Sequence, residues 1–336
     1  MSNRTFVSER FHYTYGPHKA SFRIQNGETI EVVCPSGDNR LADGSELSKE
    51  RRQRSDGSAR FEGNPQAGAI LIENLRTDNC LAVDILKVDI ESQEGLTLLA
   101  PRHGLLTDDC LTTDDDPDDF TVPRRMYRWH INNQDQVAVL QNTFGSSRWT
   151  IPLRPMIGSI GVCPAWGEHI SSLNAGTFGG NLDLPILEAG ATILLPVFHP
   201  EGMLFVGDLH AAQGHGEIVG GAIEVSGKVE LRVRNLPRGG VCAPLIFSRN
   251  YVYAVATDGD LRQAVSLAYS RLLHWLSGTF DWNRWDTYQL ISQTGVVEIG
   301  GIVVRPCFTV AAGVPIKLLP VESHREIEKW RGSAGP

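Results

Sequence analysis

The chain has 336 residues, 41% of them hydrophobic, and a formal net charge of −8. A chain of this size can bury one large core or two modest ones. Its acidic balance argues against a nucleic-acid partner, because proteins that bind nucleic acids usually carry a basic face. The one basic run, residues 49–54, is short and polar, so we interpret it as a solvated loop.

Neither the cysteines nor the N-terminus indicates export. No two cysteines form a C-x-x-C pair, residues 1–5 contain no apolar signal core, and no run of 18 apolar residues occurs. We therefore expect a cytoplasmic protein with reduced thiols, no membrane partner and no nucleic-acid partner. The six cysteines are Cys34, Cys80, Cys110, Cys163, Cys242 and Cys307.

Alternating apolar and polar residues predict strands along most of the chain. Turn signals, such as Asn26-Gly27 and Ser226-Gly227, fall between the predicted strands. The clearest alternation covers residues 22–25, 29–33, 81–90 and 229–234.

Two polar stretches predict loops. Residues 36–68 are rich in Gly, Ser, Asp, Arg and Gln, a composition typical of mobile or functional segments. Residues 108–119 are rich in aspartate, which suggests calcium binding, but they lack the Asp-x-Asp-x-Asp-Gly spacing and the later Glu of an EF-hand loop. We interpret this second stretch as a solvated acidic loop.

Helical signal is confined to the C-terminal third. Residues 260–273 place apolar side chains at three-and-four spacing after an acidic start, and residues 285–292 predict a shorter helix. The expected fold is therefore mainly β, with sandwich- or barrel-like sheets and a few helices in the C-terminal third. We expect one unit over residues 1–336, with a division into two β subdomains (about 1–150 and 151–320) that share one site left open.

The sequence contains no signature of serine catalysis or of nucleotide binding. The G-x-S-x-G elbow is missing, and Ser159 in Gly158-Ser159-Ile160-Gly161 is misplaced for one. Cys163 has no base nearby in sequence, so we interpret it as a small buried hydrophobe. Neither a P-loop nor a dinucleotide fingerprint occurs.

Polar chemistry concentrates between residues 191 and 230. An apolar run leads into Asp208 and His210, which share one face if they lie on a strand, since side chains alternate with period two. A carboxylate and an imidazole that converge in this way form half of a divalent-metal site. Glycines at positions 214 and 216 permit a sharp reversal that returns Glu217 to the same neighbourhood on the next strand. Further polar groups within reach of this hairpin are Gln213, His215 and Glu224.

A second polar pair lies upstream. Asn181 and Asp183 follow two glycines and are expected on one strand face, and Glu168 and His169 precede them. Buried carboxylates need partners. Two such pairs within apolar strands therefore favour a metal site over arginine pairing or capped turns.

These segments resemble the acetamidase/formamidase family. Residues 207–217 (GDLHAAQGHGE) are similar to the family signature GD-x-HA-x-x-GDGE, and residues 179–183 (GGNLD) to its GGN-x-D segment. His215 stands where the family usually has Asp, and Phe178 where His is frequent. Further similarity lies at residues 64–65, 81–85, 158–164 and 286–292, so the resemblance spans roughly residues 10–320.

The resemblance implies a β-rich, metal-dependent amidase that forms a homodimer or higher homo-oligomer and releases ammonia from a small amide such as formamide or acetamide. We expect Asp208 and His210 to bind the metal, with Asp183 or His215 completing the shell. An imidazole can replace a carboxylate ligand, but His215 would change the charge and the metal preference of the site. The expected metal is zinc, and calcium stays open.

The catalytic roles are assigned as hypotheses. Glu217 is the expected general acid/base, and Glu168 is a second candidate carboxylate. Asn181 could donate a hydrogen bond to the oxyanion. Two alternatives stay open: a non-catalytic, β-rich metal- or ligand-binding protein, and a hydrolase of another non-peptide carbon–nitrogen compound. A closed four-ligand metal shell would favour the first of these.

Overall fold

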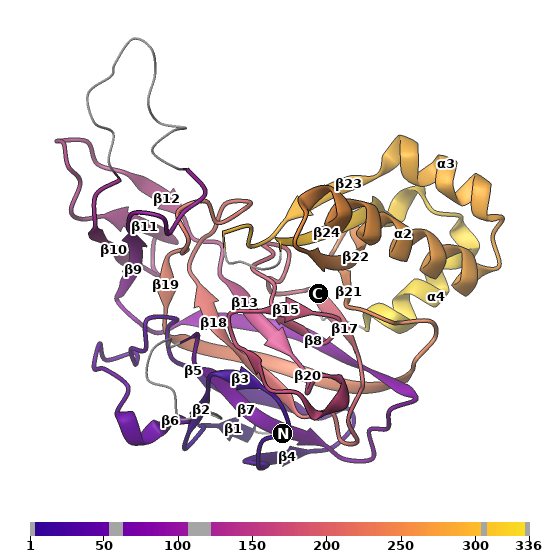
Figure 1. Cartoon of the computed structure of the whole chain (residues 1–336), viewed down its shortest axis with the longest axis horizontal. Coiled ribbons are helices and arrows are strands. Elements are labelled where there is room, and N and C mark those ends of the chain that lie inside the picture. Colours follow the sequence, from indigo (N-terminus) through magenta and orange to yellow (C-terminus); the bar gives the residue numbers. More distant parts are fainter. Residues whose placement is uncertain (1–3, 54–62, 107–121, 304–307, 333–336) are drawn as a thin grey trace, which may run out of the picture.

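The computed structural model describes residues 4–53, 63–106, 122–303 and 308–332. The predicted acidic loop at 108–119, together with Cys110 and Cys307, lies outside the described residues. Two large β-sheets pack through one hydrophobic core, and helices cover one end of the first sheet, at the right of Figure 1. The mainly β fold with helices near the C-terminus is therefore confirmed.

The first sheet has nine strands and is antiparallel except where β1 runs parallel to β5. Its longest strands, β8 and β20, pair along their whole length, and buried residues alternate with partly exposed ones on β20 as the sequence pattern predicts. In spatial order the strands are β1 (Arg4–Phe6), β5 (Thr29–Cys34), β20 (Gly227–Pro237), β8 (Asn79–Ile90), β17 (Thr192–Pro196), β21 (Leu245–Phe247), β22 (Tyr251–Asp258), β24 (Phe308–Pro315) and β23 (Val296–Ile299).

The second sheet has 13 strands and branches at β18 (Leu204–His210), which pairs with β13 (Met156–Gly161) on one side and with β7 (Gln66–Ile72) and β19 (Glu224–Val225) on the other. Every residue of β18 is buried. The remaining strands are β12 (Thr150–Pro152), β11 (Val137–Leu140), β10 (Arg125–Asn132), β9 (Glu94–Leu99), β16 (Gly179–Asn181), β15 (Ala175–Gly176), β2 (Phe11–His12), β4 (Phe22–Ile24) and β6 (Arg52–Gln53).

Short elements complete the described chain. A two-stranded ribbon joins β3 (Thr14–Tyr15) to β14 (Ile170–Ser171). Single 3-10 turns are η1 (Lys49–Arg51), η2 (Ala165–Gly167) and η3 (Ile316–Leu318). The predicted turn at Asn26-Gly27, with Gly27 at φ 84°, carries the chain from β4 in the second sheet to β5 in the first.

The first sheet is buried on both faces. On β17, Ile193 and Leu195 belong to the core between the two sheets, whereas Leu194 packs in the core under the helices. On β22, Val255 likewise lies in the core between the sheets, and Ala254 lies in the core under the helices. The described molecule therefore has three layers: sheet, sheet and helices.

Both predicted helices are confirmed. Helix α2 (Leu261–Phe280) begins at Asp260, whose side chain accepts a hydrogen bond from the backbone N–H of Gln263. Helix α3 (Arg284–Thr294) begins at Asn283, which caps it in the same manner. No helix in the described ranges is both long and apolar enough to cross a membrane.

A third helix, α4 (Val321–Arg331), was not predicted. Its sequence is mostly charged, and its buried side chains are only Ser323, Ile327 and Trp330, so its apolar stripe is narrow. The helix is held instead by its backbone: Arg234 of β20 donates hydrogen bonds to the carbonyl oxygens of Lys329 and Trp330.

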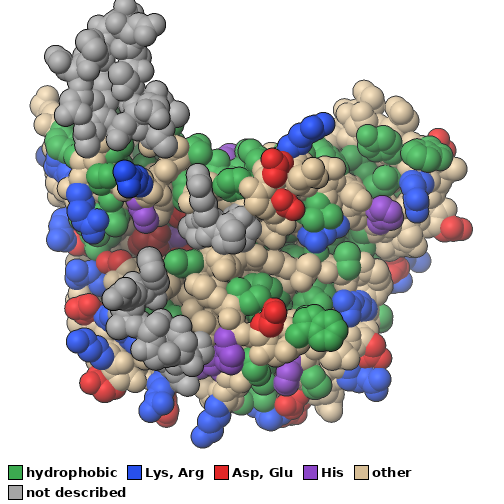
Figure 2. Space-filling model, viewed as in Figure 1, with side chains coloured by type: hydrophobic (Ala, Val, Ile, Leu, Met, Phe, Trp, Pro, Cys, Tyr) green, Lys and Arg blue, Asp and Glu red, His purple; other side chains and the backbone are tan. Residues whose placement is uncertain are grey.

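The outline of the molecule is hollowed on one side. Strands β9 to β12 form an arm at the left of Figure 1, the helices form a lobe at the right, and Figure 2 shows a broad hollow between them. On the face seen in Figure 2, acidic and basic side chains of the described residues are interspersed.

Candidate active site

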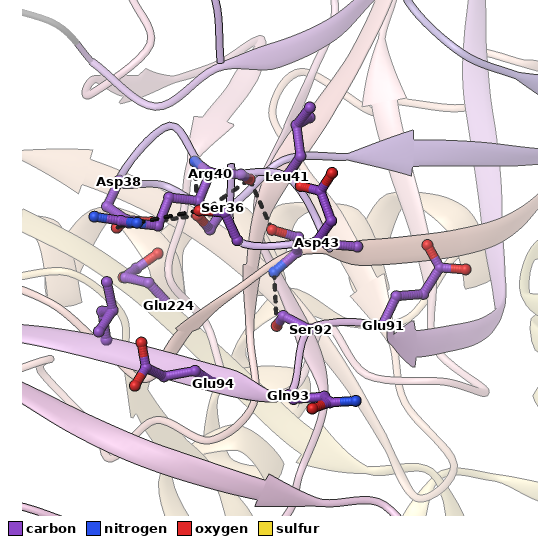
Figure 3. Close-up of a pocket in the computed structure, with 14 residues that line it drawn as sticks. Ser36, Asp38, Arg40, Leu41, Asp43, Glu91, Ser92, Gln93, Glu94 and Glu224 are labelled. Atoms are coloured by element: carbon purple, nitrogen blue, oxygen red, sulfur yellow. Dashed lines mark hydrogen bonds and ion pairs between the residues drawn. The ribbon is translucent and has the colours of Figure 1, made fainter. Parts of the chain in front are cut away.

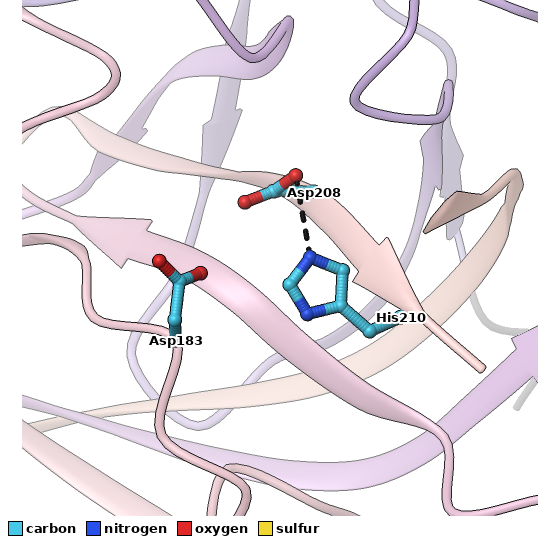
Figure 4. Close-up of side chains that lie close together, drawn as sticks. All are labelled: Asp183, Asp208 and His210. Carbon is cyan, nitrogen blue, oxygen red and sulfur yellow. Dashed lines mark ion pairs between the residues drawn. The ribbon is translucent and has the colours of Figure 1, made fainter. Parts of the chain in front are cut away.

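Five buried or nearly buried side chains form a carboxylate–histidine cluster. Ligand atoms of Asp183, Asp208 and His210 lie within 4.8 Å of one another, and the same holds for His210, Glu217 and Glu224. His210 belongs to both groups and therefore stands at the centre. Figure 4 shows Asp208 and Asp183 on either side of its imidazole.

Strand β18 presents Asp208 and His210 together, as predicted. The antiparallel register places Ile157 opposite Leu209 and Ser159 opposite Gly207, so Gly158 faces Asp208. A Cβ at Gly158 would lie 2.7 Å from Oδ2 of Asp208, 2.8 Å from Cε1 of His210 and 2.9 Å from Oδ1 of Asp183. The cluster is thus packed directly against the backbone of Gly158, where there is no room for a side chain.

Three of the acids occupy the left-handed backbone region. The φ angles are 48° at Asp183, 60° at Asp208 and 48° at Glu217. Such angles are uncommon for residues other than glycine, and they concentrate at functional sites. The chain is therefore bent at each of these positions so that the carboxylate points inward.

The prediction that Asn181 and Asp183 share a strand face is wrong. Strand β16 ends at Asn181, and the chain turns at Asp183, where the backbone N–H donates to the carbonyl oxygen of Gly158 over 3.0 Å. The turn, and not strand alternation, brings the Asp183 carboxylate to the amide of Asn181, which donates a hydrogen bond to Oδ2.

The prediction that Glu217 returns on the next strand is also wrong. Glu217 lies in the loop between β18 and β19, and it reaches the cluster because that loop folds back. The residue on the next strand is Glu224, which pairs directly with His210 in the register of β18 and β19. The sequence had indicated Glu224 only as a nearby polar group; the pairing register was the missing signal.

Neutral donors hold Asp208. Asn64 donates to Oδ2 of Asp208 over 2.7 Å and to Oδ1 of Asn181 over 2.8 Å. The hydroxyl of Ser159 lies 2.6 Å from that same Asn181 oxygen and 3.1 Å from Oδ2 of Asp208. Asn64, just before β7, and Ser159, on β13, are not predicted as site residues, because both are distant in sequence from Asp208.

His210 is oriented from both of its nitrogens. Nδ1 lies 2.7 Å from Oε1 of Gln213. Nε2 lies 3.5 Å from Oδ1 of Asp208 and 3.4 Å from Oε1 of Glu224. The imidazole therefore presents one nitrogen to two carboxylates.

Burial dominates the electrostatics of the cluster. Together with the neighbouring carboxylates, it raises the pKa of Asp183 and of Glu224 well above the usual range, and it raises the pKa of Glu217 to about 7. Burial disfavours the charged form of His210, but Glu224 and Asp208 outweigh it and raise the pKa of the imidazole. Among the described residues, no Lys or Arg pairs with these acids.

Two carboxylate oxygens of the cluster are buried without a hydrogen-bond partner among the described residues: Oδ1 of Asp183 and Oε2 of Glu224. An unpaired buried carboxylate is costly, so a cation fits the arrangement. Carboxylate oxygens and an imidazole nitrogen are the donors that divalent metals take. The residues present therefore match a metal ion in chemistry and in charge.

Two predicted site residues are not brought into the cluster. Glu168 is exposed, just after the turn η2. The side chain of His215 is 57% exposed and points to Glu298, with Nδ1 3.3 Å from Oε2. Phe178, at the position where the family often has His, is buried against the ring of Tyr15.

A cavity of about 390 Å³ adjoins the cluster at Glu224 (Figure 3). Its acidic walls are largely paired: Asp38 with Arg40 at 3.0 Å, and Glu94 with Arg128 at 2.6 Å. Glu224 is the shared wall, and its side chain is 15% exposed, against 1% for His210. Other lining residues that Figure 3 labels are Ser36, Leu41, Asp43, Glu91, Ser92 and Gln93.

The fold and the cluster together define a β-rich protein with a buried acid–imidazole site. The model of the acetamidase/formamidase family matches residues 169–320, the segment that carries all five members of the cluster. The resemblance to the acetamidase/formamidase family is therefore confirmed for this segment.

Individual relatives agree with this assignment. The chain is 45% identical over 103 residues to a formamidase of Methylophilus methylotrophus (29% of this chain, 25% of the relative). It is 45% identical over 64 residues to an acetamidase of Mycolicibacterium smegmatis (19% and 16%). The aligned segments thus cover a quarter or less of these relatives. The fold also matches an acetamidase structure from Yersinia enterocolitica, with a TM-score of 0.77 and 28% identity over 93% of this chain and 91% of that chain.

Proposed function

We propose that the protein is a metal-dependent amidase that hydrolyses a small linear amide, of the formamide or acetamide type, to a carboxylate and ammonia. The observation that carries this proposal is the cluster: two buried carboxylate oxygens lack a partner, and one imidazole nitrogen faces two carboxylates, within the segment that matches the family. We also propose a cytoplasmic homodimer or larger homo-oligomer.

Asp183, Asp208, His210 and Glu224 would hold the ion, expected to be zinc with calcium also compatible with oxygen ligands. When bound, a divalent ion polarises a carbonyl group and makes water more acidic. Its charge would also offset the repulsion among the buried acids, which no Lys or Arg of the described residues relieves.

Glu217 is proposed to move the proton. Burial raises its pKa to about 7, and the charge of a bound ion would favour its ionised form, so Glu217 could accept a proton at a carboxylate oxygen. It would accept a proton at a carboxylate oxygen from the water that attacks the amide carbon, and then deliver that proton to the departing nitrogen. The carbon–oxygen bond forms first and leaves the negative charge on the former carbonyl oxygen. The carbon–nitrogen bond then breaks as the nitrogen receives the proton, so that ammonia leaves and the carboxylic acid product ionises.

Asn181 keeps its proposed role as oxyanion donor. One hydrogen of its amide is given to Asp183, and its oxygen accepts from Asn64. The second amide hydrogen is the one proposed to meet the oxyanion. The cavity beside Glu224 is of a size to admit a small amide.

Elemental analysis of the purified protein and an ammonia-release assay test this function. Wild-type protein should carry near-stoichiometric metal and should release ammonia from formamide or acetamide, with propionamide and urea as comparison substrates. Asp208→Ala should lose the metal and at least about 100-fold in activity, whereas the exposed Asp78→Ala should retain both.

Metal retained by Asp208→Ala would overturn the ligand assignment. Metal in the wild type without ammonia from any small amide would instead favour the alternative, a non-catalytic metal- or ligand-binding protein. Light scattering after size exclusion tests the proposed oligomer.

A further inference from the structure

We propose that Gln213 is a positioning residue that decides which nitrogen of His210 faces the carboxylates and ties that imidazole to the turn at Asp183. The catalytic consequence of this inference rests on the proposed function, but the geometry of the contact does not. Gln213 lies in the loop after β18, three residues beyond His210, and is partly buried.

The orientation of the Gln213 amide is determined at its far end. Nε2 of Gln213 lies 2.6 Å from the backbone carbonyl oxygen of Asp183, which can only accept a hydrogen bond. The amide nitrogen must therefore face Asp183, and the amide oxygen must face His210. The reversed amide would place two acceptors against each other.

The orientation of the amide then determines the tautomer of His210. Oε1 of Gln213 accepts at 2.7 Å, so Nδ1 of His210 must carry the hydrogen. Nε2, which faces Asp208 and Glu224, is then the ring nitrogen that would give up its hydrogen to an ion. Within the described residues, Gln213 is the partner of Nδ1, so this side chain holds the hydrogen on that nitrogen and leaves Nε2 toward Asp208 and Glu224.

Gln213 also joins two parts of the site that have no direct strand pairing. β16, which leads into Asp183, and β18, which carries His210, each pair with β13 and not with each other. The two hydrogen bonds of Gln213 span this separation and hold the left-handed turn at Asp183 against the imidazole. Partners of this kind around a metal ligand commonly change affinity or activity by about 10- to 100-fold.

Three variants of the full-length protein, studied as the metal-loaded enzyme, test the proposal. Gln213→Met keeps the length of the side chain and removes both hydrogen bonds. Gln213→Glu keeps an acceptor for Nδ1 and loses the donor for the Asp183 carbonyl. Gln293→Met, on exposed helix α3, is the matched control.

The first readout is the imidazole nitrogen spectrum of protein labelled with ¹⁵N-histidine, in which the signals of His210 are those absent from His210→Gln. Wild type, Gln213→Glu and Gln293→Met should show the Nδ1 hydrogen of His210 at the low-field position of a hydrogen-bonded imidazole, and Gln213→Met should lose this low-field shift. The second readout is metal removal by a chelator, which should be about 10- to 100-fold faster in Gln213→Met and intermediate in Gln213→Glu. The kcat should fall more than KM changes.

A wild-type nitrogen spectrum together with wild-type metal retention in Gln213→Met would overturn the proposal. If that variant does not fold, Gln213→Asn takes its place, because its shorter amide cannot span both partners. A wild type without metal and without amidase activity would refute the proposed function, whereas the nitrogen spectrum of the same protein would still test the role of Gln213.

Discussion

Gly158 shows how closely the cluster depends on a residue without a side chain. Gly158→Ala would place a methyl group within 3 Å of atoms of Asp208, His210 and Asp183. Because displacements of about 1 Å can cost about 100-fold in rate, we expect a loss of this size in ammonia release with the fold retained by circular dichroism. The control is Gly214→Ala, where a Cβ meets nothing within 4 Å and activity should stay near wild type.

A buried histidine outside the cluster makes stability depend on pH. His12 is 3% exposed, its Nδ1 has no hydrogen-bond partner among the described residues, and its ring lies 4.1 Å from that of His18. Burial, followed by His18, lowers its pKa from 6.5 to about 3. Between these values the unfolded chain binds a proton that the folded protein does not, so stability is lost as pH falls below 6.5.

Urea unfolding at pH 7 and pH 5 measures this effect. His12 should contribute about 2 kcal/mol of lost stability over that interval, because each pH unit within the window is worth about 1.4 kcal/mol. His12→Gln, which can still donate to the carbonyl oxygen of Gly68, should lose about that much less than wild type. The exposed His130→Gln should follow the wild type, and equal losses in all three proteins would contradict the assignment.

The sequence could predict those site residues whose placement is local. Asp208 and His210 are two positions apart in an apolar run, so strand alternation predicts that they lie together, and the left-handed backbone at Asp208 completes the inward turn of its carboxylate. Glu224 depends on the register between β18 and β19, and Asn64 on a contact 144 residues away, which no local pattern contains. Glu168 and His215 are residue types that suit such a site, but their side chains do not enter the cluster: Glu168 is exposed, and His215 points to Glu298.

At the scale of elements, one buried carboxylate joins a strand pair to the C-terminal helix. Asp84 of β8 is 1% exposed and lies 2.9 Å from Nε of Arg232 and 2.8 Å from Nη2 of Arg234, both on β20. Arg234 in turn donates to the carbonyl oxygen of Trp330 on α4. Asp84 thus orients the arginine that holds the end of α4.

Asp84→Ala should therefore destabilise the protein by about 3 kcal/mol, because it leaves two partly buried guanidinium groups without their buried carboxylate. Chemical denaturation measures the change. Asp78→Ala removes an exposed ion pair with Arg76 and should cost at most about 1 kcal/mol. Similar losses in the two variants would show that Asp84 is not a structural centre.

The helices and strands differ in how well the sequence predicts them. Strands β5 and β20 and helices α2 and α3 follow from periodicity, since each buries side chains at the expected spacing, whereas β8 is buried without interruption from Cys80 to Ile85. Helix α4 does not, because it is anchored through backbone carbonyls that carry no sequence signal. The assembly of the strands into two sheets is likewise non-local: β20 lies between β5 and β8, far from both in sequence.

For the whole molecule, the shared first sheet predicts cooperative unfolding. Its inward side chains complete the core between the sheets, which includes residues from Phe6 to Ala311, and its outward side chains complete the core under the helices. Neither core can be exposed without loosening the other. Following the unfolding of the helical layer and of the whole chain in the same experiment therefore tests the prediction of a single unit.

The two buried tryptophans, Trp275 and Trp330, lie in the core under the helices, so the fluorescence change on unfolding is weighted toward the helical layer. Far-ultraviolet circular dichroism is dominated by the secondary structure of the whole chain. We expect the two signals to change together in urea, with one midpoint. Separate midpoints would show that the helical layer unfolds as an independent body.

The left-handed backbone at Glu217 serves the reaction but lowers the stability of the fold. A glutamate at φ 48°, buried among other acids, holds a conformation that glycine adopts without strain. Glu217→Gly should therefore abolish ammonia release and, in chelator-treated protein, resist denaturation better by about 1 kcal/mol. A variant that is both inactive and less stable would contradict this. If the expectation holds, laboratory evolution for heat survival alone would select against the residue that the reaction needs.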